Sequence, residues 1–202
     1  VAAMLGAITG PSIARGVSFL KESLNTAVFA SDIQIIDDPH VLRGDGSRPW
    51  DGEGLVVSRR NIIQDGVLTT WLLNSASAHQ LGLRSTGHAT RGIGSPPGVS
   101  STNTWMVAGP KSPEELMADA GEGLLITEMF GPSLNSNTGD YSVGVSGYKI
   151  ESGMRSFPVS EITIAGNLAA LYKTMIPGND LKMDSATCAP SLLCEGLTIA
   201  GK

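Results

Sequence analysis

The sequence lacks most of the short motifs by which catalytic sites are recognised. No G-x-S-x-G stretch lies between a predicted strand and a helix, so serine-hydrolase chemistry is unsupported. The run Gly92-Ile93-Gly94 lacks the third glycine and the βαβ setting of a dinucleotide-binding loop. No two of the histidines His40, His79 and His88 have the i, i+4 spacing that places two imidazoles on one side of a helix. Any metal site would therefore have to be assembled by the fold.

Charge and cysteine are also scarce. Charged residues make up 16% of the chain, the net charge is -5, and no basic run is longer than Arg59-Arg60. The electrostatic footprint of a nucleic-acid binder is missing, and direct nucleic-acid binding is disfavoured. The two cysteines, Cys188 and Cys194, have a C-x5-C spacing that matches no common zinc or redox motif. We expect reduced structural thiols and a cytoplasmic protein.

Residues 1–10 are apolar but have no basic region before them and meet a break at Gly10-Pro11. This pattern fits neither a signal peptide nor a membrane span and predicts a buried helix. Because the chain begins without methionine, we expect that upstream sequence is absent from it.

Glycine is abundant, with 25 of 202 residues, which is about 12% against a usual share of about 7%. Glycine together with valine, isoleucine, threonine and serine indicates many short strands joined by tight turns. The length favours one domain, residues 1–202. We predict an α+β fold with a large, curved antiparallel sheet, half-barrel or barrel-like, and three to five peripheral helices.

Periodicity and turn signals place the individual elements. Ser112 and Glu115 form a capping-box pattern at a helix start, Ser75 and Asn167 are predicted helix caps, and residues 151–153 predict a hairpin turn. Residues 82–101, rich in glycine, serine and proline, predict a long exposed loop. The predicted helices are residues 2–8, 12–24, 75–81 and 168–176 and one that begins after Ser112; the predicted strands are residues 32–36, 55–58, 67–73, 102–108, 123–129, 141–150, 155–165 and 192–199.

Acidic residues cluster at Asp37-Asp38 and at Asp51 and Glu53. Paired carboxylates perform acid/base chemistry when their surroundings separate their pKa values. The glycines that flank Asp51 and Glu53 fit a turn or a partner contact equally well.

Seven segments, in their order along the chain, resemble the C-terminal domain of the TldD/PmbA family, and most closely the PmbA/TldE-type subunit. They are residues 18–20, 51–54, 66–68, 85–89, 137–142, 158–168 and 178–181. The resemblance implies a cytosolic zinc metallopeptidase of two subunits that acts on unfolded or extended peptides. In such a pair the TldD-type subunit carries an H-E-x-x-x-H helix and a later cysteine ligand, and the TldE type lacks them.

The window that matches the zinc motif reads Gly6 to Pro11 in this chain. Gly6, Ala7 and Pro11 stand where the motif has its two histidines and its glutamate, and none of them can bind zinc or accept a proton from water. Neither Cys188 nor Cys194 matches the cysteine ligand convincingly. We therefore expect no catalytic residue and no metal or cofactor bound by this chain, with zinc on a TldD-type partner subunit.

The same resemblance leads us to expect peptide or partner contacts from the segments that it shares with the family. The residues concerned are Asp51, Glu53, Thr86, His88, Asn137, Thr138 and Asp140. Two alternatives stay open: a homodimeric peptide-binding scaffold, and a metal-independent acid/base hydrolase that uses Asp51 and Glu53 with Asp37 and Asp38.

Overall fold

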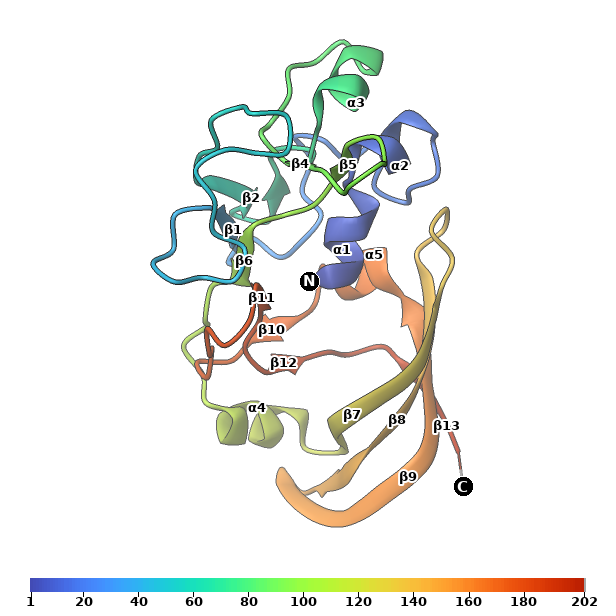
Figure 1. The fold of residues 1–202 in the computed structure, drawn as a ribbon. Coiled ribbons are helices and arrows are strands. Elements are labelled where there is room, and N and C mark those ends of the chain that lie inside the picture. Colours follow the sequence, from blue (N-terminus) through green and yellow to red (C-terminus); the bar gives the residue numbers. More distant parts are fainter. Residues whose placement is uncertain (202) are drawn as a thin grey trace. The chain divides into compact units, whose positions relative to one another are not determined.

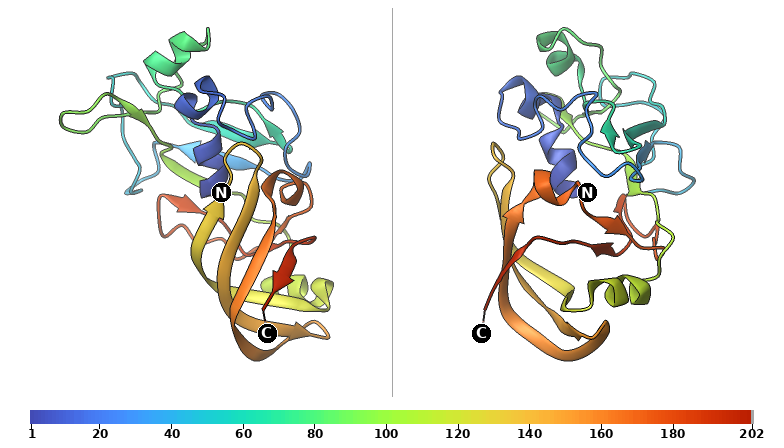
Figure 2. Two further views of the ribbon diagram at one scale, coloured as in Figure 1. Left: turned by 90° about the vertical axis from the view of Figure 1, so that its right-hand side faces the viewer. Right: turned by 180° about the vertical axis from the view of Figure 1, so that it is seen from behind.

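The computed structural model describes residues 1–201, which fall into two compact units (Figure 1, Figure 2). Unit 1 comprises Val1–Val107 and Lys182–Ala189, and unit 2 comprises Ala108–Leu181 and the residues from Pro190 onward. Each unit has its own sheets and helices. The expectation of one domain over residues 1–202 stays a prediction.

Unit 1 is built around a five-stranded sheet in the order β11-β6-β1-β2-β3. The central strand β1 pairs antiparallel with β2 and with β6, and β11 adds to β6 in parallel. A second sheet consists of β4 and β5 alone. The elements of this unit are α1 Ala2–Ala7, α2 Gly10–Ala14, β1 Ile35–Asp38, β2 Arg60–Gln64, β3 Val67–Leu68, α3 Ser75–Gln80, β4 Ala89–Thr90, β5 Gly98–Val99, β6 Asn103–Met106 and β11 Thr187–Cys188.

Burial of β1 on both faces places it in the core of unit 1. Ile35, Ile36 and Asp37 are all buried, so the strand shows no alternation of inward and outward residues. Apolar side chains of the neighbouring strands, including Ile62, Ile63 and Met106, are also buried. A carboxylate at the third position of such a strand has to find its hydrogen-bond partners inside the protein.

Unit 2 contains a four-stranded antiparallel sheet in the order β13-β9-β8-β7, whose long strands curve side by side in Figure 1. Val143, Val145, Ile162 and Ile164 form its buried cluster. Two short strands, β10 and β12, form a separate pair. The elements of this unit are α4 Pro113–Ala120, β7 Gly123–Leu134, β8 Asp140–Glu151, β9 Met154–Asn167, α5 Leu168–Leu171, β10 Ile176–Pro177, β12 Leu192–Leu193 and β13 Thr198–Ala200.

The α+β class predicted from the sequence is confirmed, with five helices among residues 1–201, but the strands divide among four sheets rather than one. Those strands form no closed barrel in the described part of the chain, and the half-barrel stays a prediction. None of the helices within residues 1–201 combines the length and apolar character that a membrane crossing requires.

The structure confirms two predicted helix caps and one predicted hairpin turn. The capping box of Ser112 and Glu115 is present, and Asn167 caps α5. The β8–β9 turn has Ser152 and Gly153 at φ 50° and 76°, as a two-residue hairpin of type I′ requires.

Several element boundaries differ from the predictions. The helix expected over residues 12–24 ends at Ala14, because Gly16 adopts φ 71° and the Val17 N–H bonds back to the Ser12 carbonyl, which closes a Schellman turn. Asn74, and not Ser75, caps α3. Residues 55–58 form no named strand, β2 begins at Arg60, and the expected loop 82–101 contains the short strands β4 and β5.

Candidate functional site

The window Gly6 to Pro11, which we expect to correspond to the zinc motif, lies across the junction of α1 and α2. Gly6 and Ala7 end α1, Thr9 has the extended φ and ψ of -68° and 139°, and Pro11 lies in the first turn of α2. The break is fixed by the Gly10 N–H, which donates to the Leu72 carbonyl at 2.7 Å, and by the Leu72 N–H, which donates to Ile8 at 3.0 Å. A motif that requires one continuous helix over six residues is therefore interrupted here.

The side chains in this window do not fit a zinc ion. Gly6, Ala7 and Pro11 offer a hydrogen atom, a methyl group and a pyrrolidine ring, none of which donates a lone pair. Among residues 1–201, moreover, no three side chains of His, Cys, Asp or Glu gather closely enough to hold a metal ion. His40 and His79 are exposed, and both cysteines are free thiols. Burial raises the pKa of Cys194 to about 11, so this thiol stays protonated at neutral pH.

Asp51 organises the acidic turn of unit 1 through its buried carboxylate. Its Oδ1 accepts hydrogen bonds from the backbone N–H groups of Glu53 and Leu55, both at 2.9 Å. Its Oδ2 accepts from the Ala89 N–H at 3.2 Å, which ties the turn to β4. Glu53 accepts from the backbone N–H and the hydroxyl of Ser75, at 2.8 and 2.6 Å, at the start of α3. Both carboxylates are thus engaged in holding loops.

A third acidic residue, Asp37, forms a buried network with His88. Asp37 is 1% exposed and His88 is 2% exposed, and Oδ2 of Asp37 lies 3.1 Å from Nε2 of His88. The same carboxylate accepts from the Thr102 N–H, the Thr102 hydroxyl and the Thr104 hydroxyl, each at 2.7 Å. Nδ1 of His88 lies 2.7 Å from the Thr86 hydroxyl. The network therefore joins β1, β6 and the segment before β4.

The hydrogen bonds of this network govern the protonation of Asp37. Burial alone would raise the pKa of the carboxyl, but hydrogen bonds from His88, Thr104 and the Thr102 backbone outweigh burial and hold the pKa below its ordinary value of 3.8. Asp37 is consequently ionised at neutral pH.

Asp37, His88 and Thr86 follow one another in the order of a nucleophilic triad. The Thr86 hydroxyl, however, already makes hydrogen bonds to the backbone. Thr86 Oγ1 accepts the Leu73 N–H at 2.7 Å and lies 3.2 Å from the Trp71 carbonyl. Such a hydroxyl holds backbone in place. The geometry points to a structural network.

The remaining predicted contact residues lie in unit 2, at the turn between β7 and β8. The Thr138 hydroxyl donates to Asp140 at 2.6 Å, and Nδ2 of Asn167 donates to Asp140 at 3.0 Å and to the Thr138 carbonyl at 2.9 Å. The hydrogen bonds from Thr138 and Asn167 hold the pKa of Asp140 below its ordinary range. Asn137 is exposed in the middle of the connection between β7 and β8. Two of the family-like segments, 137–142 and 158–168, thus meet at one anchored turn.

The structure groups Asp51, Glu53, Thr86 and His88 in unit 1 and Asn137, Thr138 and Asp140 in unit 2. Contacts of these residues with a peptide or a partner stay a prediction. Sequence reasoning missed the pairing of Asp37 with His88. Two features of the sequence could have indicated this pairing. Asp37 follows two isoleucines in a predicted apolar segment, and Thr102 and Thr104 alternate on a second predicted strand.

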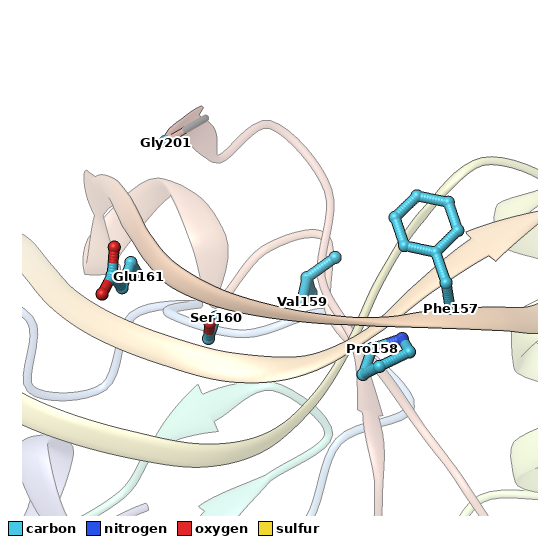
Figure 3. Close-up of a pocket in the computed structure, with 6 residues that line it drawn as sticks. All are labelled: Phe157, Pro158, Val159, Ser160, Glu161 and Gly201. Carbon is cyan, nitrogen blue, oxygen red and sulfur yellow. The ribbon is translucent and has the colours of Figure 1, made fainter.

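A shallow hollow of about 770 Å³ lies along β9 (Figure 3). Phe157 and Val159 project to one side of the strand there, while Pro158 and Ser160 project to the other. The strand bulges at this point, since Glu161 adopts φ 56° and the pairing register with β8 shifts between Val145 and Gly147. The lining residues are Phe157, Pro158, Val159, Ser160, Glu161 and Gly201, and Glu161 is the one ionisable group among them.

Comparison with known proteins identifies the family. The family model described as the PmbA/TldA metallopeptidase C-terminal domain matches residues 1–201. The chain belongs to this family. The metalloprotease PmbA of Escherichia coli O157:H7 is 41% identical over 201 residues, which cover 98% of this chain and 42% of that protein. A metalloprotease TldD homologue of Buchnera aphidicola is 26% identical over 93% of this chain and 42% of its own length.

Solved structures of this family show the same fold. A crystal structure from Bacteroides thetaiotaomicron, named as a candidate modulator of DNA gyrase, is 32% identical with a TM-score of 0.88 and covers 100% of this chain and 44% of its own. TldE from Thermococcus kodakarensis, at 21% identity, has a TM-score of 0.86 over 98% of this chain and 46% of its own. The chain thus spans less than half the length of the relatives that it matches.

Proposed function

We propose that this chain is the PmbA/TldE-type, non-metal-binding part of a heterodimeric, cytosolic zinc metallopeptidase whose TldD-type partner holds the zinc and whose substrates are unfolded or extended peptides. The observation that carries the proposal is the donorless window at Gly6, Ala7 and Pro11 on an interrupted helix. In a metallopeptidase family, a chain whose window lacks these donors needs a metal held elsewhere, and a TldD-type subunit is the holder that we propose. The similarity to both PmbA and TldD relatives supports a partner of the same family.

The place for an extended peptide is a sheet edge of unit 2. β13 pairs with β9 only from Thr163 to Ala165, so residues 154–160 of β9 have no partner strand on that side among the described residues. An extended peptide can add to such an edge through its backbone. Phe157 is 54% exposed and lines the hollow beside it, where it would contact apolar side chains of the peptide.

The acid/base alternative receives less support from the geometry. Asp51 already accepts three backbone hydrogen bonds, and Glu53 accepts two from Ser75. A general base needs a lone pair directed at the proton that it removes. Asp37 is enclosed within its own network and cannot reach a substrate.

The test measures metal and activity in three samples: this chain, the TldD-type partner, and their mixture. We expect no zinc on the chain alone, about one zinc per complex, and peptide cleavage in the mixture that a chelator abolishes. Phe157→Ser, a change on an exposed face, should raise KM for an extended peptide without dissociating the complex, and Ile199→Ser, which alters a side chain with the same 54% exposure on β13, is the matched control.

Two results would contradict the proposal. Zinc bound tightly by the chain alone would show that it builds its own metal site. Chelator-insensitive cleavage by the chain alone, lost in Glu53→Gln, would favour the acid/base hydrolase, and a homodimer that binds peptide without recruiting a TldD-type subunit would favour the scaffold.

A further inference from the structure

The turn that holds His88 brings two side chains of one short segment together. Gly87 lies between Thr86 and His88 and adopts φ 76°, in the left-handed region that glycine tolerates. The Thr86 hydroxyl lies 2.7 Å from Nδ1 of His88, although only one residue separates the two. Nε2 of the same ring lies 3.1 Å from Asp37. Both nitrogens of an imidazole that is 2% exposed thus face a hydrogen-bonding group of the protein.

The ionised state of Asp37 fixes the position of one proton on His88. A carboxylate only accepts hydrogen bonds, so the ring nitrogen that faces it must donate. Nε2 therefore carries a proton whether the imidazole is neutral or charged. Nδ1 is the nitrogen that gains or loses a proton, because it faces a hydroxyl, which can either donate or accept.

The Thr86 hydroxyl has a second place for its own proton. Its oxygen accepts the Leu73 N–H at 2.7 Å, and the Trp71 carbonyl lies 3.2 Å away. With neutral His88, the hydroxyl donates to Nδ1. When Nδ1 has taken a proton from solvent water, the ring donates to the hydroxyl oxygen and the hydroxyl donates to the Trp71 carbonyl. Each of these donors has an acceptor in both states, so the site can take up a proton without a shift of heavy atoms.

Two acidic and two basic side chains reach His88 or residues next to it, while β6 contributes no charged residue. They are Asp37 of β1, Asp51, which accepts the Ala89 N–H, Arg60 of β2, which donates to the Thr86 carbonyl, and Arg48, which donates to Ser100. The two carboxylates favour a charged imidazole, and the two guanidinium groups oppose it. Protonation leaves the buried pair of His88 and Asp37 without net charge, which reduces the cost of burying the carboxylate.

The backbone that contacts the Thr86 hydroxyl also fixes the junction of α1 and α2. Leu72 lies between the two residues that the hydroxyl contacts. Its carbonyl accepts the Gly10 N–H at 2.7 Å, and its N–H donates to the Ile8 carbonyl at 3.0 Å. Residues 71–73 are each at most 5% exposed, so a change in their hydrogen bonds acts on closely packed neighbours.

We infer that His88 and Thr86 form a proton-responsive relay from Asp37 to the junction of α1 and α2. Protonation of Nδ1 turns the Thr86 hydroxyl toward the Trp71 carbonyl and holds residues 71–73 more firmly. Loss of that proton returns the hydroxyl to Nδ1 and removes one hydrogen bond from the carbonyl. The relay is independent of the proposed pairing with a TldD-type subunit, because all of its groups belong to unit 1.

The test follows the imidazole nitrogens and the backbone amides by NMR while the pH is changed over the range in which the chain stays folded. A His88→Gln variant identifies the signals of this ring. We expect a proton on Nε2 at every pH and a proton on Nδ1 only at the lower pH values. The amide shifts of Leu73 and Gly10 should move with the same midpoint as Nδ1, because both amides respond to the Thr86 hydroxyl.

Two variants at position 86 separate the hydroxyl from the rest of the side chain. Thr86→Ser keeps the hydroxyl and should keep the shared midpoint. Thr86→Val has nearly the same shape but no hydroxyl, so the pH-dependent shift of the Gly10 amide should be lost. His40→Gln, which removes an exposed imidazole, is the matched control and should leave the shifts of Leu73 and Gly10 unchanged.

Three results would overturn the inference. A bare Nε2 with the proton on Nδ1 would reverse the assigned tautomer. An Nδ1 signal that stays constant while the chain is folded would show that the site takes up no proton. Amide shifts of Leu73 and Gly10 that still titrate in Thr86→Val or in His88→Gln would show that another group causes them. The first two results are read from the wild-type chain, so they decide the matter without any variant that fails to fold.

Discussion

Replacing Asp37 by asparagine tests the buried network most directly. The carboxylate accepts four hydrogen bonds inside unit 1. Hydrogen bonds to a charged acceptor contribute about 1.5–3 kcal/mol each and neutral ones about 0.5–1.5 kcal/mol, so the change costs about 1 kcal/mol per bond. The new amide NH2 must in addition face one of the donors. We expect the free energy of unfolding to fall by about 3–5 kcal/mol, the range for breaking a buried pair.

The same variant should alter the dependence of stability on pH. Because the folded-state pKa of Asp37 is lowered, its contribution is fully present above the unfolded pKa of about 4 and is lost as the pH falls through the folded pKa. The Asp37→Asn variant has no titrating carboxyl at this position. Its free energy of unfolding should therefore decrease less steeply than that of wild type when the pH is lowered below about 4.

Urea unfolding monitored by tryptophan fluorescence is the suitable assay, because the three tryptophans, Trp50, Trp71 and Trp105, all lie in unit 1. For a chain of this size 1 kcal/mol shifts Tm by about 2–4 °C, so Tm should fall by about 6–20 °C. Asp32→Asn, at an exposed position, is the control and should stay within about 0.5 kcal/mol of wild type. A loss below 1 kcal/mol for Asp37→Asn would refute the argument that the ionised carboxylate organises this region.

Three further substitutions have defined expectations. Asn167→Ala removes the cap of α5 and the anchor of the β7–β8 turn and should lower the stability of unit 2 by about 1–2 kcal/mol in thermal unfolding followed by circular dichroism; no loss would show that the turn holds without it. Gly147→Ala places a Cβ 2.0 Å from the Leu125 carbonyl oxygen and should cost more than about 2 kcal/mol, so a wild-type Tm would contradict the close strand approach. Gly6→Ala, with open space at its Cβ, should stabilise α1 by up to about 1 kcal/mol in the same assay, and a loss would mean that the position is crowded.

The parts of the fold that could be predicted from the sequence depend on neighbours in the chain. A serine followed three residues later by a glutamate, and a Ser-Gly pair between alternating strands, have nearly the same energetics in any protein. The end of α2 at Gly16 is determined by local residues as well. The apolar residues near Gly16, however, resemble those of a helix that continues. The division of strands among four sheets depends on pairings over long stretches of sequence, such as β6 with β11, for which periodicity carries no information.

The features of the candidate site also differ in whether the sequence alone could predict them. The lack of zinc donors at Gly6, Ala7 and Pro11 is a property of the residue types and could be stated from the sequence alone. That Asp51 and Glu53 hold loops became evident only from their distances to backbone N–H groups. The pairing of Asp37 with His88 joins positions 51 residues apart, which no local pattern predicts.

The connectivity of the two units has a practical consequence for cutting the chain. The polypeptide passes from one unit to the other after Val107, after Leu181 and after Ala189, and the short return supplies β11 to the edge of β6. A protease that cleaves at any one of these crossings leaves two fragments that both contribute residues to at least one unit. Expression of residues 1–107 by themselves would leave the Thr104 and Trp105 backbone without its β11 partner, so the fragment should aggregate unless the missing octapeptide, residues 182–189, is added back.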